Sequence, residues 1–87
     1  MASYSVIIEN RAQKEIRKLP HTIRIRIVEA IDGLETDPFP SSSKQLSGVD
    51  AFRLRLGDYR IIYTYKSKIL TVIIVRVAHR REVYRGL

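Results

Sequence analysis

Three arginines lie close together in the stretch D-A-F-R-L-R-L-G-D-Y-R-I-I-Y-T-Y, as Arg53, Arg55 and Arg60. Side chains of a strand alternate between its two faces, so Arg53 and Arg55 share one face while the apolar residues between and around them share the other. A guanidinium group can bind two oxygens of a phosphate through two parallel hydrogen bonds, and it stabilises negative charge that develops on the phosphate during a reaction. The pattern predicts a surface for an anion such as a phosphodiester.

A histidine, a tyrosine and more arginines follow in the segment A-H-R-R-E-V-Y-R-G-L. His79 is able to move a proton near neutral pH, and the ring of Tyr84 is able to stack on a base. Residue types alone allow two readings of each group. In the non-functional reading, His79 is an ordinary surface histidine and Tyr84 is an aromatic ring that closes the core. The arginine surface is then a solvated face of the sheet.

The net charge of +7 is unevenly distributed. Residues 1–50 contain seven basic and seven acidic side chains, whereas residues 51–87 contain nine basic and two acidic ones. An excess that is localised in this way is typical of contact with nucleic acid or with an acidic protein. The residues expected to bind RNA without taking part in the chemistry are Lys44, Arg53, Arg81 and Arg85.

Metal-dependent chemistry is not indicated by the sequence. The chain has no Cys, and its basic half offers only His79, Asp58 and Glu82 as ligands. It contains no glycine-rich phosphate loop and no G-x-S-x-G or H-E-x-x-H motif. We therefore expect neither a metal nor a cofactor.

The arginines are expected to lie on a hairpin. Gly57 and Asp58 predict a two-residue turn, because Gly accepts the positive φ that such a turn requires. Like charges directly opposite each other destabilise a sheet, so the arginine pair that this turn creates indicates an anionic ligand. The expected cross-strand pairs are Leu56 with Tyr59, Arg55 with Arg60, Leu54 with Ile61, and Phe52 with Tyr63.

The first half of the chain predicts a strand and two helices. Residues 4–8 form a short β-branched strand, and residues 11–19 a helix capped by Asn10 with Gln13 as its capping-box partner. Pro20 ends that helix, and an amphipathic stripe predicts a second one from position 21 or 22 to about 35. The two helices should form an antiparallel hairpin on the apolar face of the sheet. Residues 36–48 are expected to be a loop.

The second half completes the sheet. Residues 69–77 are apolar almost throughout, which is typical of a central strand buried on both faces. A short helical turn after this strand is expected to fold over the arginine face, which would place His79 near Arg55 and Arg60. The prediction is one α/β domain of the α+β type over residues 1–87: a strand, a two-helix hairpin and a three-stranded antiparallel meander in one mainly antiparallel sheet.

The sequence shows no signal peptide and no apolar run of membrane-spanning length. We expect a cytoplasmic protein with no membrane partner.

The order of these elements, with R-L-R-L-G-D-Y-R-I-I-Y and V-R-V-A-H-R-R-E-V-Y, resembles the RelE/ParE toxin superfamily of bacterial and archaeal toxin–antitoxin modules, and its RelE-type mRNA interferases in particular. The resemblance covers nearly the whole chain. It implies metal-independent cleavage of mRNA on the translating ribosome. It also implies neutralisation by a cognate antitoxin, expected to be RelB-like, acidic and folded on binding.

The resemblance assigns roles by position. The basic pair of the family's second strand falls on Arg53 and Arg55, and the arginine of its G-x-Y-R turn falls on Arg60. Arg80 and Arg81 are alternatives for the arginine after the last strand. The tyrosine of E-V-Y falls on Tyr84. The residues implied to be catalytic are Arg55, Arg60, His79, Arg80 and Tyr84.

Two departures from the family pattern leave the proton-transfer group to be identified. In the best-known relatives both residues of the strand pair are lysine, and one of them takes a proton; in another branch a glutamate in the preceding loop does so. This chain has arginines at the positions of the lysine pair, and it has Pro and Ser in the loop where the other branch has glutamate. Arginine is a poor general base, so His79, a histidine that some branches use, is the remaining candidate. The sequence does not choose between base and acid.

Three functions remain open at this point. The first is a ribosome-dependent endoribonuclease toxin. The second is a non-nuclease toxin that inhibits DNA gyrase, as the ParE branch does. The third is a non-catalytic RNA-binding module, which would show salt-dependent binding alone. The presence of His79 and Tyr84 favours the endoribonuclease, because a gyrase inhibitor or a plain RNA-binding module would not need them.

Overall fold

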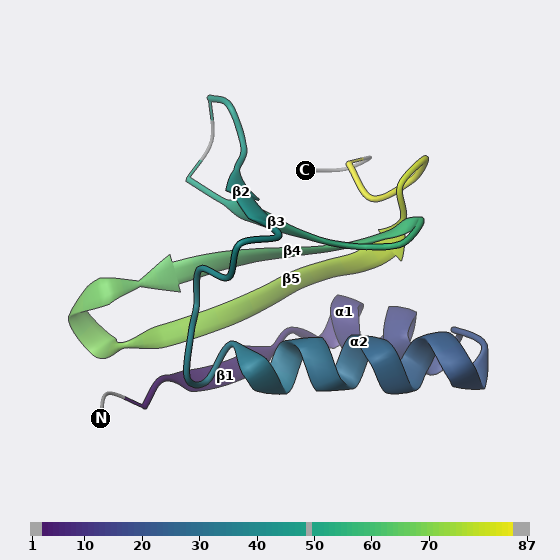
Figure 1. The fold of residues 1–87 in the computed structure, drawn as a ribbon, viewed down its shortest axis with the longest axis horizontal. Coiled ribbons are helices and arrows are strands. Elements are labelled where there is room, and N and C mark those ends of the chain that lie inside the picture. Colours follow the sequence, from purple (N-terminus) through teal and green to yellow (C-terminus); the bar gives the residue numbers. More distant parts are fainter. Residues whose placement is uncertain (1–2, 49, 85–87) are drawn as a thin grey trace.

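The computed structural model describes residues 3–48 and 50–84 of the chain. Its elements are β1 (Ser5–Ile8), α1 (Asn10–Arg17), α2 (His21–Gly33), β2 (Ser43–Gln45), β3 (Phe52–Leu56), β4 (Tyr59–Lys66), a 3-10 turn (Ser67–Ile69) and β5 (Thr71–His79). Both helices lie on one side of the sheet, and residues 80–84 fold back on the other side (Figure 1). The expected α+β class is confirmed.

The strands form one sheet in the order β1-β5-β4-β3-β2. β1 runs parallel to β5, and the other pairs are antiparallel. The prediction of a loop over residues 36–48 is wrong at one place, because β2 lies within it. Its Ser-Lys-Gln sequence lacks the alternation of a half-buried strand, and β2 exists as a strand only through its pairing with the edge of β3.

The helices occupy nearly the expected ranges, but α1 begins differently. Glu9 rather than Asn10 stands at the N-cap, and its side chain makes no capping hydrogen bond. Gln13 folds back over the helix start and donates a hydrogen bond from Nε2 to the carbonyl oxygen of Ile8 at 2.8 Å. Within the described ranges no helix is long and apolar enough to cross a bilayer.

A single core joins the helices to the sheet. Burial of apolar side chains is the main stabilising term for a domain of this size. β5 lies inside the sheet and supplies much of this core, as its apolar sequence predicts. The core residues are Ala12 and Ile16 of α1, Ile27, Ile31 and the adjoining Leu34 of α2, Leu54 of β3, Ile61 and Tyr63 of β4, and Val72, Ile74 and Val77 of β5.

A β-bulge in β5 changes the face on which its last residues lie. Two successive residues of β4 lie opposite Arg76 and Ile74, so Val75 is an extra residue in β5. The extra residue reverses the alternation of side chains. Ile74 and Val77 therefore both join the core, and Arg76 lies on the opposite face. This reversal decides where every side chain after Val75 points.

The loop between α2 and β2 is fastened to the core by Tyr63. Its hydroxyl donates a hydrogen bond of 2.7 Å to the carbonyl oxygen of Pro38. Phe39 packs beside it, with its ring 4.9 Å from that of Phe52 and 5.1 Å from that of Tyr65. These contacts place the serines that follow Pro40 beside β3.

Tyr63→Phe is expected to lower the free energy of unfolding by about 1 kcal/mol, because it removes one buried hydrogen bond. Burial raises the pKa of Tyr63 above its ordinary value of 10.0, since a phenolate is poorly solvated in the core. The unfolded chain loses this proton near pH 10.0 while the folded chain retains it. The stability contributed by Tyr63 is therefore complete below that pH and declines as pH rises through the folded pKa.

The measurement is urea unfolding of the parent and of Tyr63→Phe at about pH 8 and about pH 11. The parent should lose more stability between these values than the variant does. Tyr84→Phe, which changes an exposed tyrosine, is the control and should follow the parent. An equal loss in parent and Tyr63→Phe would contradict this account.

Candidate active site

The β3–β4 hairpin has the predicted register in every pair. Leu56 lies opposite Tyr59, and Arg55 lies opposite Arg60. Gly57 adopts a φ of +59°, the left-handed conformation that the turn requires. Tyr59 packs against the core on the helix side of the sheet. The arginine pair therefore lies on the side away from the helices.

β2 adds a fourth cation to this side. Lys44 lies directly opposite Arg53, so both side chains share the face of Arg55 and Arg60. We call Lys44, Arg53, Arg55 and Arg60 the basic face. A hollow of about 420 Å³ opens on it, lined by Ser41, Ser42, Lys44, Arg53, Arg55 and Gly57. Hydroxyl groups beside three cations suit the oxygens of a phosphate.

Arg60 differs from the other members of the basic face because it is buried, with 9% of its surface exposed. Its Nη1 donates to the carbonyl oxygens of Gly57 at 2.8 Å and Tyr59 at 2.9 Å. These two hydrogen bonds brace the hairpin turn. Arg55 is exposed and Arg53 is partly exposed.

Residues 80–84 form a turn that folds back over the basic side of the sheet, as predicted (Figure 1). The backbone N–H groups of Glu82 and Val83 donate to the carbonyl oxygen of His79 at 2.8 and 3.0 Å. Val83 is fully buried, whereas Tyr84 is 45% exposed. The 80–84 turn thus carries an exposed aromatic ring at the end of a well-anchored segment.

Arg80 links this turn to the tip of the hairpin. Its backbone N–H donates to the carbonyl oxygen of Asp58 at 2.7 Å. The side chains of the two residues also form a long ion pair, with Nε 3.9 Å from Oδ1 and both groups largely exposed. Such a pair contributes little to stability, so the guanidinium of Arg80 is available to a ligand.

His79 does not lie where the predicted fold placed it. Its ring contacts that of Tyr59 edge to face at 5.7 Å, on the helix side of the sheet. It was expected near Arg55 and Arg60, and the bulge at Val75 is the reason for the difference. A hollow of about 360 Å³ surrounds it, lined by Glu15, Lys18, Leu19, Tyr59, Val77, Ala78, His79 and Glu82.

This hollow opens at the rim of the sheet, since Glu82 of the 80–84 turn lines it together with residues of α1. Nδ1 of His79 accepts a hydrogen bond from the backbone N–H of Arg81 at 3.2 Å. With Nδ1 as the acceptor, a hydrogen is on Nε2, so Nε2 is a donor toward a substrate. The side chain of Arg81 is exposed, and Arg85 lies outside the described residues. Across residues 3–48 and 50–84 no three His or carboxylate groups converge as a metal site.

Known proteins are similar to this chain in both sequence and fold. A family model described as the ParE toxin of the type II toxin–antitoxin system parDE matches residues 6–84. The chain is 34% identical over 86 residues to toxin RelG of Mycobacterium tuberculosis, covering 94% of this chain and 97% of that protein. The chain belongs to the RelE/ParE family of type II toxins.

Solved structures of RelE-type toxins have the same fold. The toxin–antitoxin complex RelBE2 of M. tuberculosis matches with 33% identity and a TM-score of 0.78, over 90% of this chain and 99% of that one. The archaeal RelE–RelB complex of Pyrococcus horikoshii matches with 32% identity and a TM-score of 0.82, over 93% of this chain and 99% of that one.

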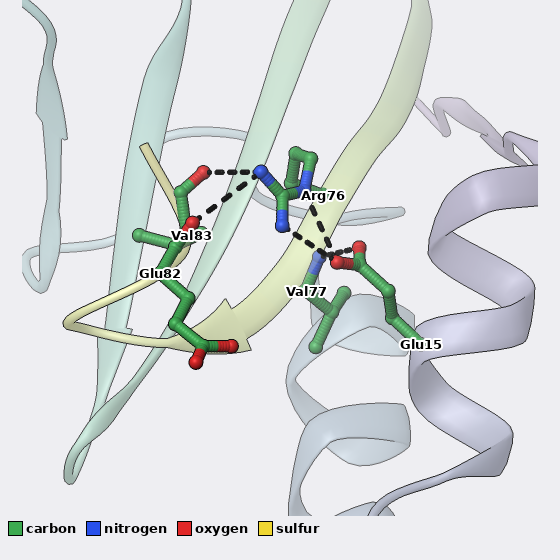
Figure 2. Close-up of polar contacts among 5 residues, drawn as sticks. All are labelled: Glu15, Arg76, Val77, Glu82 and Val83. Carbon is green, nitrogen blue, oxygen red and sulfur yellow. Dashed lines mark hydrogen bonds and ion pairs between the residues drawn. The ribbon is translucent and has the colours of Figure 1, made fainter. Parts of the chain in front are cut away.

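Sequence reasoning missed two residues that organise the site of this RelE-type toxin. Arg76 of β5 is buried, and its Nε and Nη2 donate to Oε2 of Glu15 on α1 at 3.1 and 2.8 Å. Its Nη1 donates to the carbonyl oxygen of Val83 at 3.0 Å (Figure 2). The available signal was a lone arginine within an apolar strand, because a buried charge requires a partner.

Proposed function

We propose that this toxin is an endoribonuclease that cleaves mRNA on the ribosome, in the cytoplasm, without a metal. The observation that carries the proposal is that the 80–84 turn, which includes the exposed residues Arg80 and Tyr84, folds back over the side of the sheet that holds the basic face (Figure 1). The proposed step is attack of a ribose 2′-hydroxyl on its own phosphate. The P–O bond to the next nucleotide breaks, which leaves a cyclic phosphate or its 3′-phosphate hydrolysis product and a 5′-hydroxyl.

The roles follow from position and chemistry. Arg55 holds the scissile phosphate, while Arg60 and Arg80 stabilise the charge of the pentavalent phosphate. Tyr84 stacks on or orients the neighbouring base. His79 transfers a proton: with Nδ1 accepting from the N–H of Arg81 it donates through Nε2–H, and to take up a proton at Nε2 its ring hydrogen must first move to Nδ1, which breaks that hydrogen bond. The residues proposed to bind flanking RNA are Lys44, Arg53, Arg81 and Arg85.

We also propose a cognate antitoxin, RelB-like and acidic, that folds as it binds. The complexes of M. tuberculosis and P. horikoshii support this proposal, because in both a relative of this chain is bound to a Rel-type antitoxin. An acidic segment complements the net charge of +7. We place its contact at the segment that begins at Arg80, which it covers or displaces.

The family model favours a second function, inhibition of DNA gyrase, because its description names the ParE toxin. A ParE-like toxin would inhibit DNA gyrase and cleave no RNA. The deciding experiment is a translation reaction with purified toxin, followed by mapping of mRNA ends and, in parallel, a gyrase supercoiling assay. Cleavage that requires ribosomes supports the nuclease. Intact mRNA together with blocked supercoiling would identify the gyrase inhibitor.

Arg55→Glu is expected to weaken ribosome binding strongly and to reduce its dependence on salt. Each lost phosphate contact lowers the slope of log affinity against log salt by about one. Lys14→Glu, on the exposed surface of α1, makes the same charge change on the helix side and should alter binding little. The measurement is ribosome affinity across a salt series. Equal effects of the two variants would contradict the assignment of the basic face.

Arg80→Ala is expected to slow single-turnover cleavage by about a hundredfold or more, since it removes a donor to the transition state. Its melting temperature should stay close to that of the parent, because its ion pair with Asp58 is long and exposed. Arg81→Ala tests the alternative assignment, and Arg26→Ala on α2 is the matched control. If Arg81→Ala shows the larger loss, the role belongs to Arg81.

A further inference from the structure

The 80–84 turn is held at both of its ends by hydrogen bonds. At its start, the carbonyl oxygen of His79 accepts from the N–H groups of Glu82 and Val83. At its end, the carbonyl oxygens of the same two residues accept from Nη1 of Arg76, at 3.5 and 3.0 Å. Tyr84 follows directly after this second attachment, so the place of its ring depends on Arg76.

Arg76 is held in turn by Glu15, whose carboxylate also accepts a backbone hydrogen bond at the edge of β5 where no strand pairs with it. β1 ends at Ile8, which pairs with Ile74, and leaves the outer edge of β5 uncovered beyond that point. Oε1 of Glu15 accepts the backbone N–H of Val77 at 2.9 Å, and Oε2 accepts two bonds from Arg76 (Figure 2). One carboxylate thus joins α1, the edge of β5 and the guanidinium.

The guanidinium supplies a direction that apolar packing does not. Burial of Val83 draws the 80–84 turn onto the sheet, but such contacts are non-directional. The planar fork of Arg76 fixes the carboxylate on one side and backbone carbonyls on the other. Both ends of this bridge are shielded, with 6% of the Arg76 side chain and 20% of the Glu15 side chain exposed.

We propose that Glu15 and Arg76 are positioning residues that hold the 80–84 turn and thereby set where Arg80 and Tyr84 meet the substrate. The part that concerns cleavage rests on the proposed nuclease function. The holding of the turn is a property of the free protein and is measured without any substrate.

The first test is hydrogen exchange of Glu15→Gln. This change keeps the size of the side chain but removes its charge, and it turns one acceptor into a donor that faces either Arg76 or the N–H of Val77. We expect the amides of Glu82 and Val83 to exchange about tenfold faster or more, while core amides of β4 keep the parental rate. Glu29→Gln, an exposed position on α2, is the matched control.

The second test is single-turnover cleavage by the same variant. At saturating ribosomes we expect a loss of about tenfold to a hundredfold, since small displacements of catalytic groups have effects of this size. Ribosome affinity should change less than about twofold, because the basic face is intact. Arg76→Lys keeps the charge but loses the planar guanidinium, and it should show the same loss of cleavage with the same ribosome affinity.

A double variant separates positioning from general damage. If Glu15 acts through the turn, Glu15→Gln should have little further effect in a protein that already carries both Arg80→Ala and Tyr84→Ala, whereas independent effects would multiply. Parental exchange of Glu82 and Val83 in Glu15→Gln would overturn the proposal, and so would multiplying effects on cleavage. If the parent itself cleaves no mRNA, the proposed function fails, and the exchange result alone decides whether the pair holds the turn.

Discussion

A toxin carrying His79→Asn is expected to cleave mRNA about a hundredfold more slowly than the parent, or slower still, because loss of a general acid or base has effects of this order. Asparagine cannot transfer the proton. Its side-chain oxygen can still accept the N–H two residues ahead, as Nδ1 of His79 does from Arg81. The variant therefore removes the proposed chemistry and preserves the start of the 80–84 turn.

His79→Ala is the partner of this variant, since it removes both proton transfer and the hydrogen bond to Arg81. Single-turnover cleavage at saturating ribosomes is the measurement, with thermal melts to confirm folding. Equal losses in the two variants support proton transfer. If His79→Asn cleaves within a few-fold of the parent, that role fails, and catalysis would rest on the arginines and a ribosomal group.

Glu15→Leu is expected to lower the free energy of unfolding by about 3–5 kcal/mol, because it removes the carboxylate that accepts two hydrogen bonds from the buried guanidinium of Arg76. It also removes the acceptor of the Val77 N–H. Arg76→Leu should cost less, about 1.5–3 kcal/mol for the lost charged hydrogen bonds. The remaining carboxylate of Glu15 is 20% exposed and can reach water.

The measurement is denaturant unfolding of both single variants and of the double variant. The double variant should be more stable than Glu15→Leu alone, since it no longer buries a guanidinium that has lost its carboxylate. Glu29→Leu, at an exposed position of α2, should stay within about 0.5 kcal/mol of the parent. A double variant that is less stable than Glu15→Leu would show that the burial of the Arg76 charge is not what makes Glu15 necessary.

The features that were predictable from the sequence depend on neighbouring residues. The alternation of residues 52–56 and the Gly-Asp turn together fix the register of the hairpin, and through it the face on which Arg53, Arg55 and Arg60 lie. The return of the 80–84 turn over that face was also predictable. It follows directly after an internal strand and carries Val83, which is fully buried there.

The features that were not predictable depend on distant residues or on small irregularities. The contact between Glu15 and Arg76 joins positions 61 residues apart, and no local pattern encodes it. β2 becomes a strand only because the edge of β3 is there to pair with. The bulge at Val75 leaves no trace in a run that is apolar almost throughout, yet it moves His79 to the helix side of the sheet.

The position of β5 in the sheet has a consequence for how this toxin folds during its synthesis. β5 lies between β1 and β4, yet it is the last strand of the sheet to be synthesised. A nascent chain therefore emerges with β1 unpaired and the sheet lacking an internal strand, and pairing between segments so far apart closes late. Arg80 and Tyr84 emerge later still. Completion of the sheet and the appearance of the candidate catalytic groups thus follow one another closely, after the other strands have been made.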